Sequence, residues 1–174
     1  MNEVIESGMV LRFPSDDFSR LDKTKEFNSI NTHNLKAVDF VYYHRESHTV
    51  LFIELKNYDT DSHPANFRSK DLIVNLQKKS ADSLLMMLSL FHGYNYMKDL
   101  YSRINPLQDR NPRFDIIHIL KVSKSQVYEI SSVHTNFQNQ FKGIAQLFSI
   151  DHFSIIPDIM ANHVLNRYGI EYLN

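Results

Sequence analysis

Two carboxylates and one lysine are the residues of this sequence whose types and spacing could do chemistry together. Asp39 and Glu54 are separated by 14 residues, and Lys56 follows Glu54 after a single leucine. Carboxylate oxygens suit Mg²⁺, which takes its other ligands from water and substrate phosphate. Such a metal polarises a phosphate ester and lowers the pKa of a bound water, and a nearby lysine orients that water or stabilises transition-state charge. If the fold brings the three residues together, they predict metal-assisted hydrolysis of phosphodiesters.

Two apolar runs are expected to position these residues. Residues 37–43 and 49–55 are rich in Val, Ile, Phe and Tyr, a composition typical of β-strands, and the polar residues 44–48 between them suit a hairpin. Side chains alternate between the two faces of a strand, so Glu54 and Lys56 share a face. Because the second strand is apolar on both faces, we expect it to lie inside a sheet that is covered on each side.

The register of this hairpin decides whether Asp39 joins the other two residues. If His44 pairs with Thr49, Asp39 lies opposite Glu54 and on the same face. A slip of one residue would turn Asp39 to the other face. In the expected register the three charged groups meet at one end of the sheet, and buried charge is costly unless it is paired. An ordinary ion pair is the alternative interpretation, because Glu-x-Lys by itself is a very common sequence.

The remaining pattern predicts one α/β domain over residues 1–174. Apolar residues recur near the 3.6-residue helical period over residues 73–91, and residues 114–122 are a nearly continuous apolar run typical of a covered strand. The other expected elements are a strand at Met9–Phe13, irregular chain with one helical turn at 15–34, a loop at 57–66, a short helix at 94–103 after Gly93, a turn between Pro106 and Pro112, a strand at 152–156 and a helix at 157–169. The pattern of residues 123–140 is ambiguous.

The segments Val38-Asp39-Phe40 and Phe52-Ile53-Glu54-Leu55-Lys56-Asn57 resemble the core motif of the PD-(D/E)XK nuclease superfamily. The resemblance is concentrated between residues 37 and 91, with the strand at 114–122 extending it, and the same segments are similar to uncharacterised bacterial proteins of this type. It implies a mixed central β-sheet flanked by helices, a restriction-endonuclease-like core. It also implies a nuclease that uses Mg²⁺ or Mn²⁺ to hydrolyse nucleic-acid phosphodiester bonds, with DNA as the expected substrate and defence against foreign DNA as one possible role.

The resemblance also implies roles for individual residues. Asp39 and Glu54 would be metal ligands, the backbone carbonyl of Leu55 a further ligand, and Lys56 the catalytic lysine. The sequence departs from the family pattern at residue 38, which is Val rather than Pro, and in its short segment upstream of the first strand, where the family carries an acidic residue on a helix. The upstream candidates are Glu3, Glu6, Asp17 and Glu26.

Three polar residues of the expected helix are further candidates for the site. Some family members carry a functional polar residue there, and Gln77, Lys78 and Lys79 occupy the corresponding stretch. We expect a solvated helix face for these positions. The nine histidines, including His44, His48 and His63, are expected to be ordinary surface or core residues.

Composition limits the other classes of function. The chain has no cysteine, which excludes zinc-thiolate sites and cysteine nucleophiles. It shows no signal-peptide pattern and no apolar run long enough for a membrane span, so we expect a cytoplasmic protein without a membrane partner. A net charge of −1 means that any surface for nucleic acid must be local or supplied by a second copy or another protein. This charge, the small size and the short upstream segment favour the alternative function, a non-catalytic binding or structural subunit on the same fold.

Overall fold

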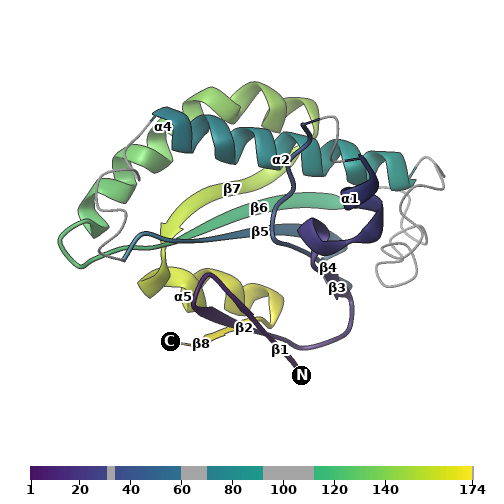
Figure 1. The fold of residues 1–174 in the computed structure, drawn as a ribbon, viewed down its shortest axis with the longest axis horizontal. Helices are drawn as coiled ribbons and strands as arrows, with labels where there is room; N and C mark the ends of the chain where they lie inside the picture. Colours follow the sequence, from purple (N-terminus) through teal and green to yellow (C-terminus); the bar gives the residue numbers. More distant parts are fainter. Residues whose placement is uncertain (31–33, 60–69, 92–111, 174) are drawn as a thin grey trace.

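A five-stranded sheet forms the centre of the protein in a computed structural model that describes residues 1–30, 34–59, 70–91 and 112–173 (Figure 1). The strands are β1 (Asn2–Glu6), β2 (Met9–Phe13), β3 (Phe18–Ser19), β4 (Phe40–His44), β5 (Thr49–Asn57), β6 (Arg113–Lys121), β7 (Ile150–Pro157) and β8 (Glu171–Leu173). The helices are η1 (Leu21–Lys23), α1 (Lys25–Ile30), α2 (Lys70–Phe91), α4 (Val127–Leu147), η5 (Asp158–Met160), α5 (Ala161–Leu165) and η6 (Asn166–Tyr168).

The central sheet has the strand order β3-β4-β5-β6-β7 and a mixed orientation. Strands β3, β4 and β5 are antiparallel neighbours, whereas β5, β6 and β7 run parallel to one another. Helices α2 and α4 provide the crossovers between the parallel strands and cover one face (Figure 1). The predicted α/β class and mixed sheet flanked by helices are therefore confirmed at this level of description.

A second, smaller sheet covers the other face. It is antiparallel, with the order β1-β2-β8, and lies with α5 below the central sheet in Figure 1. The strand at Met9–Phe13 was predicted with these bounds, but β1 and β8 were not. Each missed strand is short, and β1 alternates between half-buried and exposed positions, so neither carries a strong apolar signal.

Strand β5 is buried on both faces, as its sequence predicted. Val50 and Phe52 pack into the core beneath α2 and α4. Leu51, Ile53 and Leu55 pack into the core between the two sheets. The polar end of the strand, at Glu54 and Lys56, is therefore the exception in an apolar environment.

The β4–β5 hairpin has the predicted register. His44 pairs with Thr49 and Phe40 with Ile53, so Asp39 stands one residue before the ladder, opposite Glu54. Strand β4 begins at Phe40 rather than at residue 37. The register that brings Asp39 to the face of Glu54 is confirmed.

The helical predictions are confirmed in part. Helix α2 and strand β6 agree with their predicted ranges to within a few residues. The ambiguous segment is a 21-residue helix, α4. The helix predicted at 157–169 is three short pieces, η5, α5 and η6, which end at the left-handed Gly169 (φ 68°). The short helix predicted at 94–103, its Gly93 and most of the loop predicted at 57–66 lie outside the described residues.

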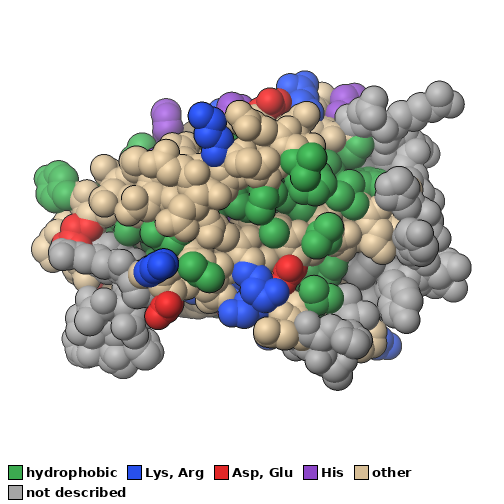
Figure 2. Space-filling view, turned by 90° about the horizontal axis from the view of Figure 1, so that it is seen from above, with side chains coloured by type: hydrophobic (Ala, Val, Ile, Leu, Met, Phe, Trp, Pro, Cys, Tyr) green, Lys and Arg blue, Asp and Glu red, His purple; other side chains and the backbone are tan. Residues whose placement is uncertain are grey.

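The outer face of the helix layer carries exposed apolar side chains. Val74 and Leu85 on α2 and Tyr128 and Leu147 on α4 are the large ones. Figure 2 shows hydrophobic side chains gathered on this face. Within the described ranges, every helix is too short or too polar to cross a membrane.

Candidate active site

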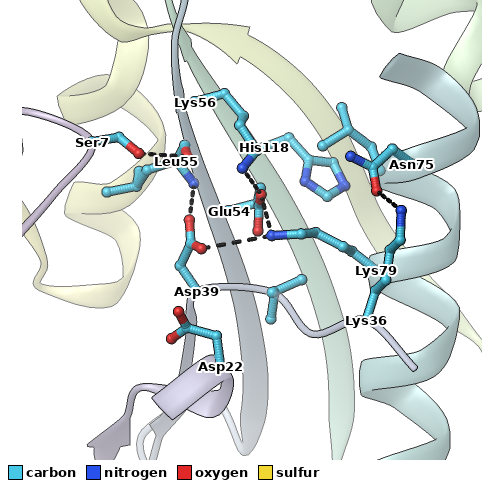
Figure 3. A network of polar contacts seen from close by, with 12 residues as sticks. Ser7, Asp22, Lys36, Asp39, Glu54, Leu55, Lys56, Asn75, Lys79 and His118 are labelled. Carbon is cyan, nitrogen blue, oxygen red and sulfur yellow. Dashed lines mark hydrogen bonds and ion pairs between the residues drawn. The ribbon is translucent and has the colours of Figure 1, made fainter. Parts of the chain in front are cut away.

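The three residues predicted from the sequence lie together at the end of the sheet where β5 ends and β4 begins (Figure 3). Lys56 Nζ is 3.0 Å from Glu54 Oε1. The N–H of Leu55 donates a hydrogen bond to Asp39 Oδ2 at 2.7 Å, so β5 holds the aspartate directly. Glu54 is completely buried, whereas 30% of the Lys56 side chain is exposed. Lys56 is thus the member of this group that solvent reaches.

Lys79, on α2, lies between the two carboxylates. Its Nζ is 2.6 Å from Glu54 Oε1 and 3.7 Å from Asp39 Oδ1, and 15% of its side chain is exposed. The expectation of a solvated helix face is therefore wrong for Lys79. It holds for Lys78, which forms an i,i+4 ion pair with Asp82 at the side of the helix. The helical period could have predicted that Lys79 faces the sheet, because Lys79 follows the buried Leu76 by three positions and so lies on the same side of the helix.

Burial and crowding shift the ionisation of these groups. Burial and the neighbouring Glu54 carboxylate raise the pKa of Asp39 to about 7, against the opposing effects of Lys79, the Leu55 N–H and Lys56. Burial lowers the pKa of Lys56, but the charge and hydrogen bond of Glu54, together with Asp39, raise it overall above its ordinary value. The site thus stabilises ammonium groups and destabilises a second carboxylate charge.

His118 on β6 is a fifth polar residue at this site, and the sequence analysis did not identify it. It is fully buried and pairs with Glu54 in the parallel register, on the same face of the sheet. Ser80 Oγ donates its single hydrogen to the carbonyl of Leu76 at 2.8 Å and lies 3.0 Å from His118 Nε2. With the Ser80 hydrogen on Leu76, the fitting tautomer of His118 is the one that donates from Nε2 to Ser80 and leaves Nδ1 as an acceptor.

Two buried acceptor atoms at the site have no hydrogen-bond partner among the described residues. They are His118 Nδ1 and Glu54 Oε2. Burial, then the charges of Lys79 and Lys56, lower the pKa of His118 to about 3, which keeps the ring neutral. Unpaired buried acceptors are costly, so both atoms mark a position where a donor or a cation would be stabilised.

An upstream acidic residue near the site is Asp22, which was not among the candidates. Figure 3 shows its carboxylate beside Asp39. Helix η1 is tied there because the N–H of Leu21 donates to the carbonyl of Asp39 at 3.1 Å. Asp22 also pairs with Arg20 at 3.8 Å. No apolar pattern marks so short a helix, which explains why the sequence did not single out Asp22.

The four upstream candidates have other partners or lie outside the description. Glu3 pairs with Arg12, Glu6 with Arg20, and Asp17 with Arg45. The side chain of Glu26 lies outside the described residues. The structure therefore brings none of the described candidates into contact with Asp39.

The predicted backbone ligand is also at the site. The carbonyl of Leu55 accepts a hydrogen bond from Ser7 Oγ at 3.3 Å. Ser7 belongs to the tight turn between β1 and β2, where both Ser7 and Gly8 have positive φ angles. The small sheet therefore reaches the site through this turn.

Comparison with known proteins gives no match to a family model, a curated protein or a solved structure. The evidence for function is therefore the site itself.

The donors at this site fit a hard divalent cation. The predicted ligands Asp39, Glu54 and the Leu55 carbonyl are all oxygens, the type that Mg²⁺ and Mn²⁺ prefer. The position of Lys79 Nζ shows that one oxygen of each carboxylate already faces a common cation. Over the described ranges, no group of three or more Asp, Glu or His side chains is arranged as a metal site. A metal here would need the backbone carbonyl, water or substrate oxygens as further ligands.

Proposed function

We propose that this protein is a metal-dependent nuclease of the PD-(D/E)XK type, which hydrolyses nucleic-acid phosphodiester bonds and acts most simply as a DNA endonuclease in defence against foreign DNA. The observation that carries the proposal is the meeting of Asp39, Glu54 and Lys56 at the end of a doubly covered strand. Each of these residues is in an environment that would destabilise its charge unless the group had a partner or a use.

The topology around the site supports the same proposal. An antiparallel hairpin carries the two carboxylates, helix α2 follows, and β6 then returns parallel to β5. These are the elements over which the sequence resembles the nuclease superfamily. In open α/β sheets, ligands bind beyond the carboxyl ends of parallel strands, which is where Glu54 and Lys56 lie.

The residues divide the chemical work as follows. Asp39, Glu54 and the Leu55 carbonyl would hold Mg²⁺ or Mn²⁺, which supplies Lewis acidity and an acidified water when bound. Lys56 extends from the buried cluster toward solvent, so its ammonium can contact an incoming phosphate and stabilise charge on it. Asp22, on helix η1, lies beside Asp39 and would add a further carboxylate to the acidic side of the site (Figure 3).

One observation favours a second candidate, a non-catalytic binding or structural subunit. The carboxylates of Asp39 and Glu54 are matched by the ammonium groups of Lys56 and Lys79. Such a closed ionic cluster satisfies most of its own charge and can serve fold specificity alone. The two candidates differ in whether loss of Lys56 removes an activity.

A cleavage assay with several nucleic acids distinguishes the nuclease from the binding subunit. Supercoiled plasmid, linear duplex, single-stranded DNA and RNA would be incubated with the protein in Mg²⁺, Mn²⁺ or EDTA. We expect metal-dependent cleavage that Lys56→Ala lowers by about 100-fold or more, since Lys56 contacts the reacting phosphate. Lys142→Ala, which removes an exposed lysine on α4, is the control and should cleave like the wild type. Equal activity of Lys56→Ala and Lys142→Ala, or no cleavage of any substrate, would favour the binding subunit.

A further inference from the structure

Lys79 occupies the position where a shared cation of the two carboxylates would lie. Its Nζ is within 2.6 Å of Glu54 Oε1 and 3.7 Å of Asp39 Oδ1, and little of its side chain reaches solvent. Figure 3 shows the side chain extending from α2 across the sheet to both carboxylates. Its ammonium group is thus an internal counter-ion.

Two hydrogen bonds hold α2 against the chain segment that precedes β4. Ser83 Oγ of α2 accepts a hydrogen bond from the N–H of Val38 at 3.0 Å, and Asp82 accepts one from the N–H of Lys36 at 2.8 Å. The helix that carries Lys79 is therefore fastened to the segment that carries Asp39. The packing of α2 on this segment therefore fixes the approach of Lys79 to the two carboxylates.

The carboxylate oxygens leave few alternatives for a metal ion. Asp39 Oδ2 accepts the Leu55 N–H, whereas Asp39 Oδ1 and Glu54 Oε1 both contact Lys79 Nζ. A cation shared by Asp39 and Glu54 through these two facing oxygens would take the position that Lys79 Nζ now holds. Two like charges a few ångströms apart in a partly buried site repel strongly.

We propose that Lys79 is a built-in competitor of the divalent metal ion for Asp39 and Glu54, and that it sets the metal affinity of the site. This inference rests on the proposed function, because it concerns the metal of the proposed nuclease. Lys79 must leave both carboxylates before they can bind a metal together. The competition makes the site selective for strongly binding divalent ions and keeps it neutralised in their absence.

His118 provides an acceptor for the displaced ammonium. Its Nδ1 is bare and buried, and Lys79 exerts the larger of the two charge effects on the ring. Figure 3 shows the imidazole beside the Lys79 side chain. The flexible lysine stem allows a short movement of this kind, so Lys79 can exchange carboxylate oxygens for an imidazole nitrogen while it stays inside the core.

The test measures metal binding rather than activity. Mn²⁺ alone would be titrated into the wild type, Lys79→Met and Lys78→Met by calorimetry. Lys78→Met is the matched control, because it removes the same charge from the next position of α2, where the lysine contacts Asp82 instead. We expect Lys79→Met to bind Mn²⁺ about tenfold or more tightly than the wild type, and Lys78→Met to stay within about twofold because its charge is solvated.

The outcomes separate this inference from the proposed function. Tighter binding by Lys79→Met supports the competition, and it still does so if the wild type binds no Mn²⁺, although the native protein would then not be the proposed metal enzyme. Equal or weaker binding by Lys79→Met, with clear binding by the wild type, overturns the competition and leaves the nuclease standing. No binding by either protein overturns both.

A second measurement uses only the wild type and remains decisive if Lys79→Met does not fold. Crystals of the wild type would be soaked in Mn²⁺, whose anomalous scattering locates the ion. We expect Mn²⁺ on Asp39 and Glu54 with Lys79 Nζ moved away from both, toward His118. Mn²⁺ bound there while Lys79 keeps both contacts, or Mn²⁺ bound only elsewhere, would overturn the proposal.

Discussion

The ionisation of Asp39 is subject to opposing effects from its surroundings. Burial and the charge of Glu54 favour its protonated form and raise its pKa to about 7, whereas Lys79 and the Leu55 N–H favour the carboxylate. A cation that binds the site would shift this balance toward the carboxylate. Near neutral pH, proton, lysine and metal would therefore compete for the same oxygens.

The shifted pKa of Asp39 predicts a pH dependence of stability in EDTA. Asp39 ionises near 3.8 in the unfolded chain and near 7 in the folded protein, so the folded state holds this proton more tightly. The stability that the group contributes is complete below the unfolded pKa and is lost as the pH rises through 7. Between about pH 4 and pH 8, the wild type should lose roughly 2 to 4 kcal/mol of unfolding free energy relative to Asp39→Asn.

Urea denaturation at several pH values measures this difference. Asp39→Asn keeps an acceptor oxygen for the Leu55 N–H and removes only the ionisation, so it is the appropriate partner for the comparison. A difference between the two proteins that does not change over this range would mean that Asp39 ionises at its ordinary pKa.

At the scale of elements, the hairpin and its register were predictable because local pattern determines them. Two apolar runs, a polar link of five residues and the side-chain period of two were enough to place Asp39 opposite Glu54. Helix α2 and strand β6 were predictable for the same reason. The three sequence-predicted site residues are those that this local geometry brings together.

The rest of the site depends on packing between distant elements, which local pattern does not encode. Lys79 reaches the carboxylates because α2 docks across the sheet, and His118 reaches Glu54 because β6 lies in one particular parallel register. In the small sheet, strand β2 was predicted, but its pairing with β8 joins segments far apart in the sequence and no local signal predicts it. Asp22 is placed by helix η1, which a backbone hydrogen bond from Leu21 to Asp39 joins to the site.

The sequence of helix α4 is ambiguous, although a helical pattern is present in it. Ile130, Val133, Phe137, Phe141 and Ala145 are buried and recur at three or four residues along its length. Their neighbours are Ser, Thr, Asn and Gln, which weakened the helical signal. Phe137 stacks on Phe141 and meets the ring of His118 edge-on at 5.1 Å between centroids, so this helix also encloses the site.

Phe137→Ala is therefore expected to destabilise the protein. The side chain is fully buried, and its removal should lower the free energy of unfolding by about 3 to 5 kcal/mol through lost burial and the cavity left behind. Tyr128→Ala is the matched control, because this aromatic on the same helix is 87% exposed and should change stability by less than about 0.5 kcal/mol. Urea denaturation measures the free energy of unfolding of both variants. Equal losses in the two variants would mean that α4 does not pack on the core through Phe137.

On the scale of the whole molecule, the net charge and the layered architecture show where a substrate could bind. The net charge of −1 provides no general attraction for nucleic acid, so the proposed function would require local groups such as Lys56 for binding. Strands β1 and β8 both belong to the small sheet, on the opposite side of the central sheet from α2 and α4 (Figure 1). The candidate site lies between these layers. Strand β5 supplies Glu54 and Lys56, and the residue before β4 is Asp39. Helix α2 supplies Lys79, and the β1–β2 turn contacts the Leu55 carbonyl.

The central claim is that Glu54, with Asp39, holds a metal ion that hydrolyses nucleic acid. The most direct test is the rate of DNA cleavage in Mg²⁺ or Mn²⁺ by the wild type and by Glu54→Gln, which keeps the shape of the side chain but removes its charge. The account predicts cleavage by the wild type that EDTA abolishes and a rate at least about 100-fold lower in Glu54→Gln. Cleavage by Glu54→Gln at the wild-type rate, or cleavage by the wild type that persists in EDTA, would contradict it.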